Sequence, residues 1–120
     1  ARSEASVILM HMLGDDPRTM QRDPRYGDVA AEVAAFLAER IAWTERQGIA
    51  RGRIAVDPGI GFGKRARHNL DLMDRLPLLA GLGCPVVFGA SRKRFLGEIT
   101  GVEDAADRVV GSVAAAMLAA

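Results

Sequence analysis

Residues 54–64 read Ile-Ala-Val-Asp-Pro-Gly-Ile-Gly-Phe-Gly-Lys, and this stretch decides the fold. The apolar run 54–56 predicts a buried strand, which the chain leaves on the acidic residue Asp57. Three glycines then alternate with Ile60 and Phe62, so the backbone can turn tightly and approach a ligand. An acid at a strand end before such a loop is typical of the ligand-binding edge of an α/β protein. The alternative is an ordinary glycine-rich turn.

Two nucleotide-binding motifs are excluded by the spacing of these glycines. A Walker A loop would need glycine at position 58 and serine or threonine at position 65, but Pro58 and Arg65 stand there. A dinucleotide-binding fingerprint would need its third glycine where Lys64 stands.

The bulk composition indicates an ordinary globular domain. The chain has 120 residues, of which 26% are charged and 49% hydrophobic, and its formal net charge is +1. Such a balance gives no general attraction to nucleic acid or to a membrane surface, so any anion site must be local. The single cysteine, Cys84, fits a reducing cytoplasm. No apolar run approaches the roughly 20 residues needed to span a bilayer, and residues 1–6 lack the plan of a signal peptide.

The rest of the chain alternates apolar runs with helical patterns. Alternation of this kind predicts parallel strands joined by right-handed helical crossovers. After a long loop over 13–27, a helix capped by Asp28 carries a core stripe and stops near Gly48. Three strands are expected at 7–10, 54–56 and 85–88, with later helices starting at Asn69, Lys93 and about Ala105.

Several packing details follow from helical spacing. The first strand should be covered on both faces, and Pro77 should end or kink the second helix near Leu76. Trp43 is expected in the core or at an interface. The core stripe of the first helix and the apolar side of the last helix are Val29, Val33, Phe36, Leu37 and Ile41, and Val109, Val113, Ala116 and Met117.

Residues with chemical potential follow each of the three strands. Because the carboxyl ends of parallel strands share one face, Met10, Asp57 and the turn from Gly89 to Lys93 should converge. His11 is expected to be a packed, hydrogen-bonded histidine, since it lacks the companions of a metal site.

Asp57 and Lys93 form the sharpest pair in the sequence. A carboxylate can accept two parallel hydrogen bonds from an amino-imine edge of a heterocycle, and an ammonium can hold a ring carbonyl or an anion. The alternative is a buried ion pair between the two. The run 92–94 predicts an anion site or, alternatively, a solvated basic face.

Three blocks together resemble bacterial dihydropteroate synthase. They are Leu9-Met10-His11-Met12, Asp57-Pro58-Gly59-Ile60-Gly61-Phe62-Gly63-Lys64 and Gly89-Ala90-Ser91-Arg92-Lys93, and Arg108 with Gly111-Ser112 adds to the likeness. The resemblance implies a (β/α)8 barrel that condenses 6-hydroxymethyl-7,8-dihydropterin diphosphate with 4-aminobenzoate, releasing diphosphate. It also implies a site open to sulfonamides and a homodimeric full-length enzyme.

The resemblance assigns roles to individual residues. Catalysis would rest on Lys93 and Asp57, with Asp57 on the amino-pyrimidine edge of the pterin and Lys93 on its polar ring atoms. The pterin would also contact Met10 and Gly89. The aminobenzoate site would be bordered by Phe62, Ser91 and Arg94, where many family members have serine in place of Arg94.

The resemblance also predicts that the chain is one segment of a larger domain. A (β/α)8 barrel takes about 250 residues, and these 120 residues match strands five to seven with their helices. Residues 1–120 are therefore expected to be the carboxyl-half segment of a single pterin-binding barrel, inactive alone. The Mg2+ ligand and the diphosphate-binding residues are expected outside it. The alternatives are a pterin-dependent methyltransferase barrel and a non-catalytic pterin-binding module.

Overall fold

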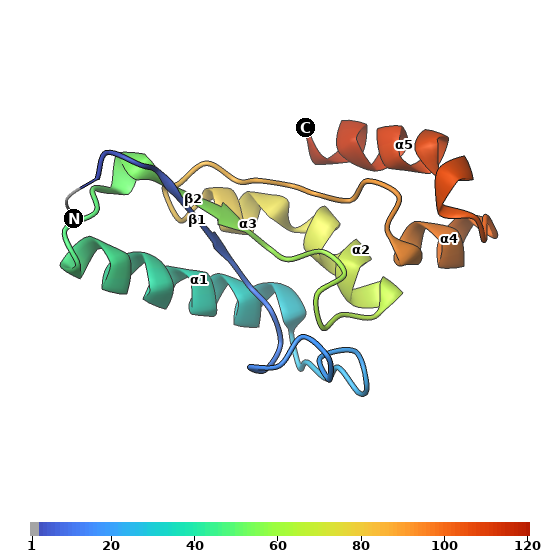
Figure 1. The fold of residues 1–120 in the computed structure, drawn as a ribbon, viewed down its shortest axis with the longest axis horizontal. Coiled ribbons are helices and arrows are strands. Elements are labelled where there is room, and N and C mark those ends of the chain that lie inside the picture. The colour runs from blue at the N-terminus through green and yellow to red at the C-terminus, as the bar shows by residue number, and fades with distance from the viewer. Residues whose placement is uncertain (1–2) are drawn as a thin grey trace.

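The computed structural model describes residues 3–120 and shows a small parallel sheet flanked by helices (Figure 1). The strands are β1 (Val7–Met10) and β2 (Ile54–Asp57). The α-helices are α1 (Val29–Arg46), α2 (Ala66–Asp74), α3 (Leu76–Ala80), α4 (Arg94–Thr100) and α5 (Val109–Ala119), with short 3-10 turns at Arg51–Arg53 and Ala105–Asp107. Within these residues no helix is long and apolar enough to cross a membrane.

The sheet is parallel, as the alternation predicts. Met10 lies opposite Asp57 in the register of β1 and β2. The predicted third strand is only an extended segment, because it pairs with β2 through a single bridge between Val56 and Val86. Two hydrogen bonds make this bridge, from Val56 N to Pro85 O and from Val87 N to Val56 O. The prediction of a full strand over 85–88 is therefore wrong, although β2 does lie between its two expected neighbours.

The core lies between β2 and the helices. The Asp28 carboxylate caps α1 by accepting a hydrogen bond from Ala31 N, as expected, and Arg46 is its last residue. Helix α1 packs against β1, α2 and α3. Most of the predicted stripe is buried, but Phe36 is 38% exposed and Trp43 is 47% exposed. Trp43 thus lies outside the core. Of its two expected settings, core or interface, the core is wrong and the interface stays a prediction.

The second helix differs from the prediction at its start but not at its end. Its N-cap is Arg65, whose N–H donates to His68 Nδ1, and Asn69 lies buried inside α2 rather than at its start. Helix α2 ends at Asp74, and a separate helix α3 begins with Pro77 in its first turn. The predicted end of the helix near Leu76 is therefore confirmed. Pro77 suits the first turn of the new helix, where its missing N–H is not needed.

Two apolar faces are more open than expected. Side chains of β1 alternate, with Ile8 61% exposed, so only one face of this strand is covered. On α5, Ala115 is the buried residue, and the predicted apolar side, which is Val109, Val113, Ala116 and Met117, is exposed. Helical spacing shows which residues of α5 share a face. It does not show which face a neighbour covers, and α4 covers the opposite side, around Ala115.

Candidate active site

The carboxyl ends of the strands meet at one edge, as the sequence predicts. Met10 and Asp57 are register partners, and His11 N continues the ladder by donating to Asp57 O at 3.1 Å. The glycine loop, residues 58–64, follows Asp57 and lies between the end of β1 and the turn that carries Lys93. The middle of the three sequence blocks therefore contacts both of the others.

The side chain of Asp57 is half-buried and only partly engaged. Its Oδ1 accepts a hydrogen bond from Gly59 N at 2.7 Å. Its Oδ2 accepts none from the side chains and amides that the structure describes. A carboxylate with an unengaged oxygen at a ligand-binding edge can accept hydrogen bonds from an incoming N–H edge.

Lys93 is held by the glycine loop. Its ammonium donates to Ile60 O and lies 4.7 Å from the centre of the Phe62 ring. Burial lowers the pKa of Lys93, and the negative charge of Asp57 partly offsets this. Among residues 3–120 the ion pairs do not include Asp57 with Lys93, so the alternative of a structural ion pair between them is not what the geometry shows.

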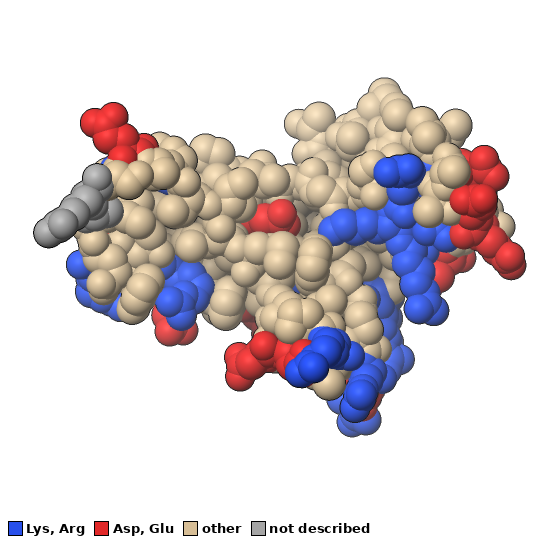
Figure 2. All heavy atoms as spheres, in the orientation of Figure 1, with Lys and Arg blue, Asp and Glu red and all other residues tan. Residues whose placement is uncertain are grey.

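A cavity of about 660 Å³ opens beside this loop. Phe62 and Lys93 line it together with Arg94, and further cationic side chains come from Arg22, Arg65 and Arg67. Figure 2 shows Lys and Arg side chains gathered on the surface around α4. The cavity therefore combines an aromatic wall with excess positive charge, which suits a flat organic anion.

The other predicted site residues lie around rather than in this cavity. Gly89 and Ser91 border a neighbouring hollow against α5. Met10 is 38% exposed at the end of β1. Arg94 lines the cavity while its Nε donates to Glu98 at 2.9 Å, so its guanidinium is partly neutralised on the surface. Arg92 and Arg94 are exposed, and only Lys93 of the basic run turns inward.

A strained turn places Lys93. Arg92 adopts φ 54°, a left-handed conformation that costs a non-glycine residue about 1–2 kcal/mol. Arg92 N donates to Ser112 Oγ at 2.7 Å, and Arg108 Nη1 donates to Arg92 O at 3.1 Å. Arg108 and Ser112, which the resemblance had singled out, thus stabilise the turn from α5 and its N-cap.

Sequence reasoning missed the role of Lys64. Its side chain is only 4% exposed, and its Nζ contacts His11 Nδ1 at 2.9 Å and donates to Gly59 O and Phe62 O. Burial lowers the pKa of Lys64 to about 7 and the pKa of His11 to about 4, with the Lys64 charge adding to the effect on His11. His11 is packed and hydrogen-bonded, as predicted, but its partner lies 53 positions away and no local pattern pointed to it.

The described residues do not form a metal site. Within residues 3–120 no group of three or more His, Cys, Asp or Glu side chains is placed to hold a metal ion. The described side chains therefore do not fit Mg2+ by themselves.

The parallel sheet, its flanking helices and the polar residues at the carboxyl ends of its strands are those of a segment of a parallel α/β barrel. The chain belongs to the pterin binding enzyme family, whose profile matches residues 1–120. It is 50% identical over 119 residues to a dihydropteroate synthase from Neisseria meningitidis serogroup B, covering 97% of this chain and 41% of that protein. It is 42% identical over 120 residues to the one from Escherichia coli K12, covering 100% of this chain and 42% of that protein.

Solved structures agree with these relatives. Dihydropteroate synthase from Xanthomonas albilineans with 4-aminobenzoic acid superposes with a TM-score of 0.87 at 51% identity, over 95% of this chain and 39% of that one. The Thermus thermophilus enzyme in complex with 6HMPPP gives 0.88 at 49% identity, over 93% of this chain and 44% of that one. The predicted family and fold class, part of a (β/α)8 barrel, are confirmed. The chain spans about two fifths of the length of these relatives.

Proposed function

We propose that this chain supplies the pterin-binding edge and part of the aminobenzoate site of a dihydropteroate synthase. The observation that carries the proposal is the contact of the three sequence blocks at one strand edge, with Asp57, Phe62 and Lys93 around the glycine loop. The relatives at 42–50% identity are named dihydropteroate synthase, and one solved neighbour holds 4-aminobenzoic acid.

In this proposal Asp57 binds the amino-pyrimidine edge of the pterin. Its Oδ2 is unengaged among the described residues, while Gly59 N donates to its Oδ1. Lys93 Nζ lies across the loop and serves the polar ring atoms of the pterin. Met10, beside Asp57 in the sheet, offers apolar contact to the ring, and Gly89 leaves room for it.

In this proposal the cavity beside the glycine loop holds the aminobenzoate. Phe62 stacks beside the aromatic amine, and the cations around it, including Arg94, attract its carboxylate. Ser91 lies at the border. The bond between the pterin methylene carbon and the diphosphate oxygen breaks, with the electron pair leaving on diphosphate. The amine then forms the new carbon–nitrogen bond and loses a proton. Fixed dipoles and charges that stabilise the electron-poor pterin favour this order.

Further groups complete this proposed enzyme. Mg2+ would bind residues outside the present segment and would shield the charge of the leaving diphosphate. The complete enzyme would act in the cytoplasm as a homodimer on small-molecule substrates, without nucleic acid or membrane.

The test is to graft residues 1–120 into the Escherichia coli relative in place of its matching segment. This grafted enzyme, folded and supplied with both substrates and Mg2+, should release diphosphate and form dihydropteroate. Dihydropteroate formation distinguishes a synthase from a methyltransferase barrel, and turnover distinguishes both from a binding module. A folded graft that binds pterin but never turns over would contradict the proposal.

A further inference from the structure

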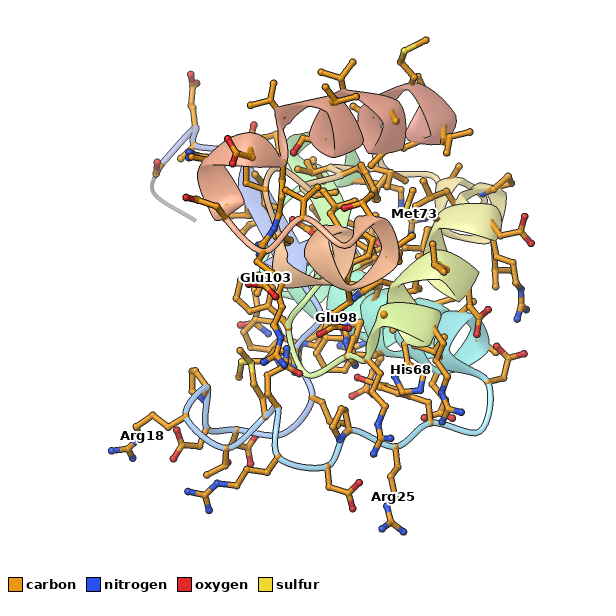
Figure 3. The ribbon with its side chains drawn as sticks, turned by 90° about the vertical axis from the view of Figure 1, so that its right-hand side faces the viewer. Arg18, Arg25, His68, Met73, Glu98 and Glu103 are labelled. Carbon is orange, nitrogen blue, oxygen red and sulfur yellow. The ribbon has the colours of Figure 1, made fainter. Side chains whose placement is uncertain are left out.

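The glycine loop is held from two sides by residues that lie far from it in sequence. On the inner side is Lys64, at the end of the loop, and on the outer side is Gln21, from the long loop between β1 and α1. Arg18 and Arg25 of that same long loop point away from the body of the protein (Figure 3), and their side chains are 88% and 83% exposed. Gln21 is also exposed, but its amide contacts the glycine loop.

On the inner side Nζ of Lys64 has three close acceptors. Two are the carbonyls of Gly59 and Phe62, at 2.9 and 3.0 Å, and the third is Nδ1 of His11 at 2.9 Å. The low pKa of His11 keeps its ring neutral near pH 7, so Nδ1 can accept. Lys64 therefore joins both ends of the loop to the end of β1.

On the outer side the Gln21 amide uses both of its polar atoms. Its Nε2 donates to Gly61 O at 2.5 Å, and its Oε1 accepts from Lys64 N at 3.1 Å. Asn69 of α2 completes the set by accepting from Gly61 N at 2.9 Å. The backbone on both sides of Phe62 is therefore fixed by side chains rather than by a sheet or helix.

The clamped loop in turn determines where Lys93 and Phe62 lie. Lys93 is held by Ile60 O and by the face of the Phe62 ring, and both belong to the loop. A shift of the loop backbone would move the cation and the aromatic wall of the cavity together. Small displacements of positioned groups are costly for reactions that depend on orientation.

We infer that Lys64 and Gln21 are positioning residues that clamp the glycine loop from opposite sides and thereby place Phe62 and Lys93 for the arylamine substrate. This inference rests on the proposed function for the identity of that substrate. Both residues also line the cavity, but the contacts that the structure gives their side chains are to the loop and to His11, so each acts through the loop.

The decisive variant is Gln21→Glu in the grafted enzyme. It preserves the size of the side chain and the acceptor for Lys64 N, but it places an oxygen against Gly61 O where a donor stood. Gln21 is exposed, so the variant is expected to fold. Gln47→Glu is the matched control, because Gln47 is exposed at the C-cap of α1 and makes no side-chain hydrogen bond among the described residues. Lys64→Met, which removes the inner ammonium, is the second variant.

Hydrogen exchange and kinetics give two independent results. In Gln21→Glu we expect the amides of residues 59–64 to exchange about tenfold faster, since a hydrogen bond of the loop is lost. We expect kcat/KM for aminobenzoate to fall about tenfold to a hundredfold, while the melting temperature stays that of Gln47→Glu. Lys64→Met, where it folds, should change both quantities further.

The outcomes separate this inference from the proposed function. Unchanged loop exchange in Gln21→Glu would overturn the clamp. Faster exchange with unchanged aminobenzoate kinetics would overturn the positioning role. An inactive parent graft whose loop still responds to Gln21→Glu would support the clamp and contradict the synthase proposal instead.

Discussion

Replacing Gly59 by alanine should disrupt the point where the glycine loop crosses β1. Gly59 has φ +70°, and an alanine Cβ there would lie 1.8 Å from the carbonyl oxygen of His11. Gly14 offers a matched control, because its φ is +71° and a Cβ there would meet nothing within 4 Å. Both substitutions incur the left-handed strain of about 1–2 kcal/mol. Only Gly59→Ala must also move backbone, which adds about 1–3 kcal/mol.

The prediction is therefore a difference in stability between two variants that carry the same glycine-to-alanine change. We expect Gly59→Ala to destabilise the grafted enzyme by about 2–5 kcal/mol and Gly14→Ala by about 1–2 kcal/mol. Urea unfolding followed by circular dichroism measures both values. The Lys64 ammonium, 3.4 Å from the added Cβ, would be displaced as well, so pterin affinity should fall only in Gly59→Ala. Equal destabilisation by the two variants would refute the close approach of this loop to β1.

Three further predictions concern charge and completeness. Lys93→Met should abolish most turnover and leave the melting temperature nearly unchanged, because Lys93 is not ion-paired with Asp57; a loss of about 3–5 kcal/mol in stability would instead reveal a buried pair. Burial, together with the charge of Lys64, lowers the pKa of His11 from 6.5 to about 4 against the opposing charge of Glu32. Stability should therefore be full above pH 6.5 and fall by about 2 kcal/mol as the pH drops through 4. His11→Gln should flatten that slope in acid denaturation, and an unchanged slope would refute its origin. The 120-residue chain alone should form no dihydropteroate in a coupled assay, because it spans about two fifths of its relatives; a rate near that of the grafted enzyme would show that it suffices.

Much of the fold was readable because it follows local periodicity. The apolar runs located β1 and β2, and Asp28 and Gly48 marked the ends of α1 to within two residues. The parallel order follows from alternation alone, and it brought Met10, Asp57 and Lys93 to one edge. The break before α3 was likewise predicted from Pro77.

The remainder depends on contacts that no local pattern encodes. Asn69 looked like a helix cap, but its side chain serves Gly61 in the preceding loop, so α2 starts earlier with a histidine acceptor. Lys64 looked like the lysine of a failed phosphate loop, although its partners are carbonyls and His11. The outer clamp by Gln21 spans about 40 residues of sequence. Periodicity also showed which residues of α5 share a face without showing whether that face is covered.

The role of Asp57 is the centre of this account, and pterin affinity tests it most directly. Isothermal calorimetry of 6-hydroxymethyl-7,8-dihydropterin diphosphate, without aminobenzoate, should be run on the grafted enzyme, on Asp57→Ala and on the exposed control Asp74→Ala. We predict that Asp57→Ala weakens binding by about 2–5 kcal/mol, as for a charged hydrogen-bond partner removed from a buried site, while Asp74→Ala binds like the parent. Equal pterin affinity in all three folded proteins would contradict the account.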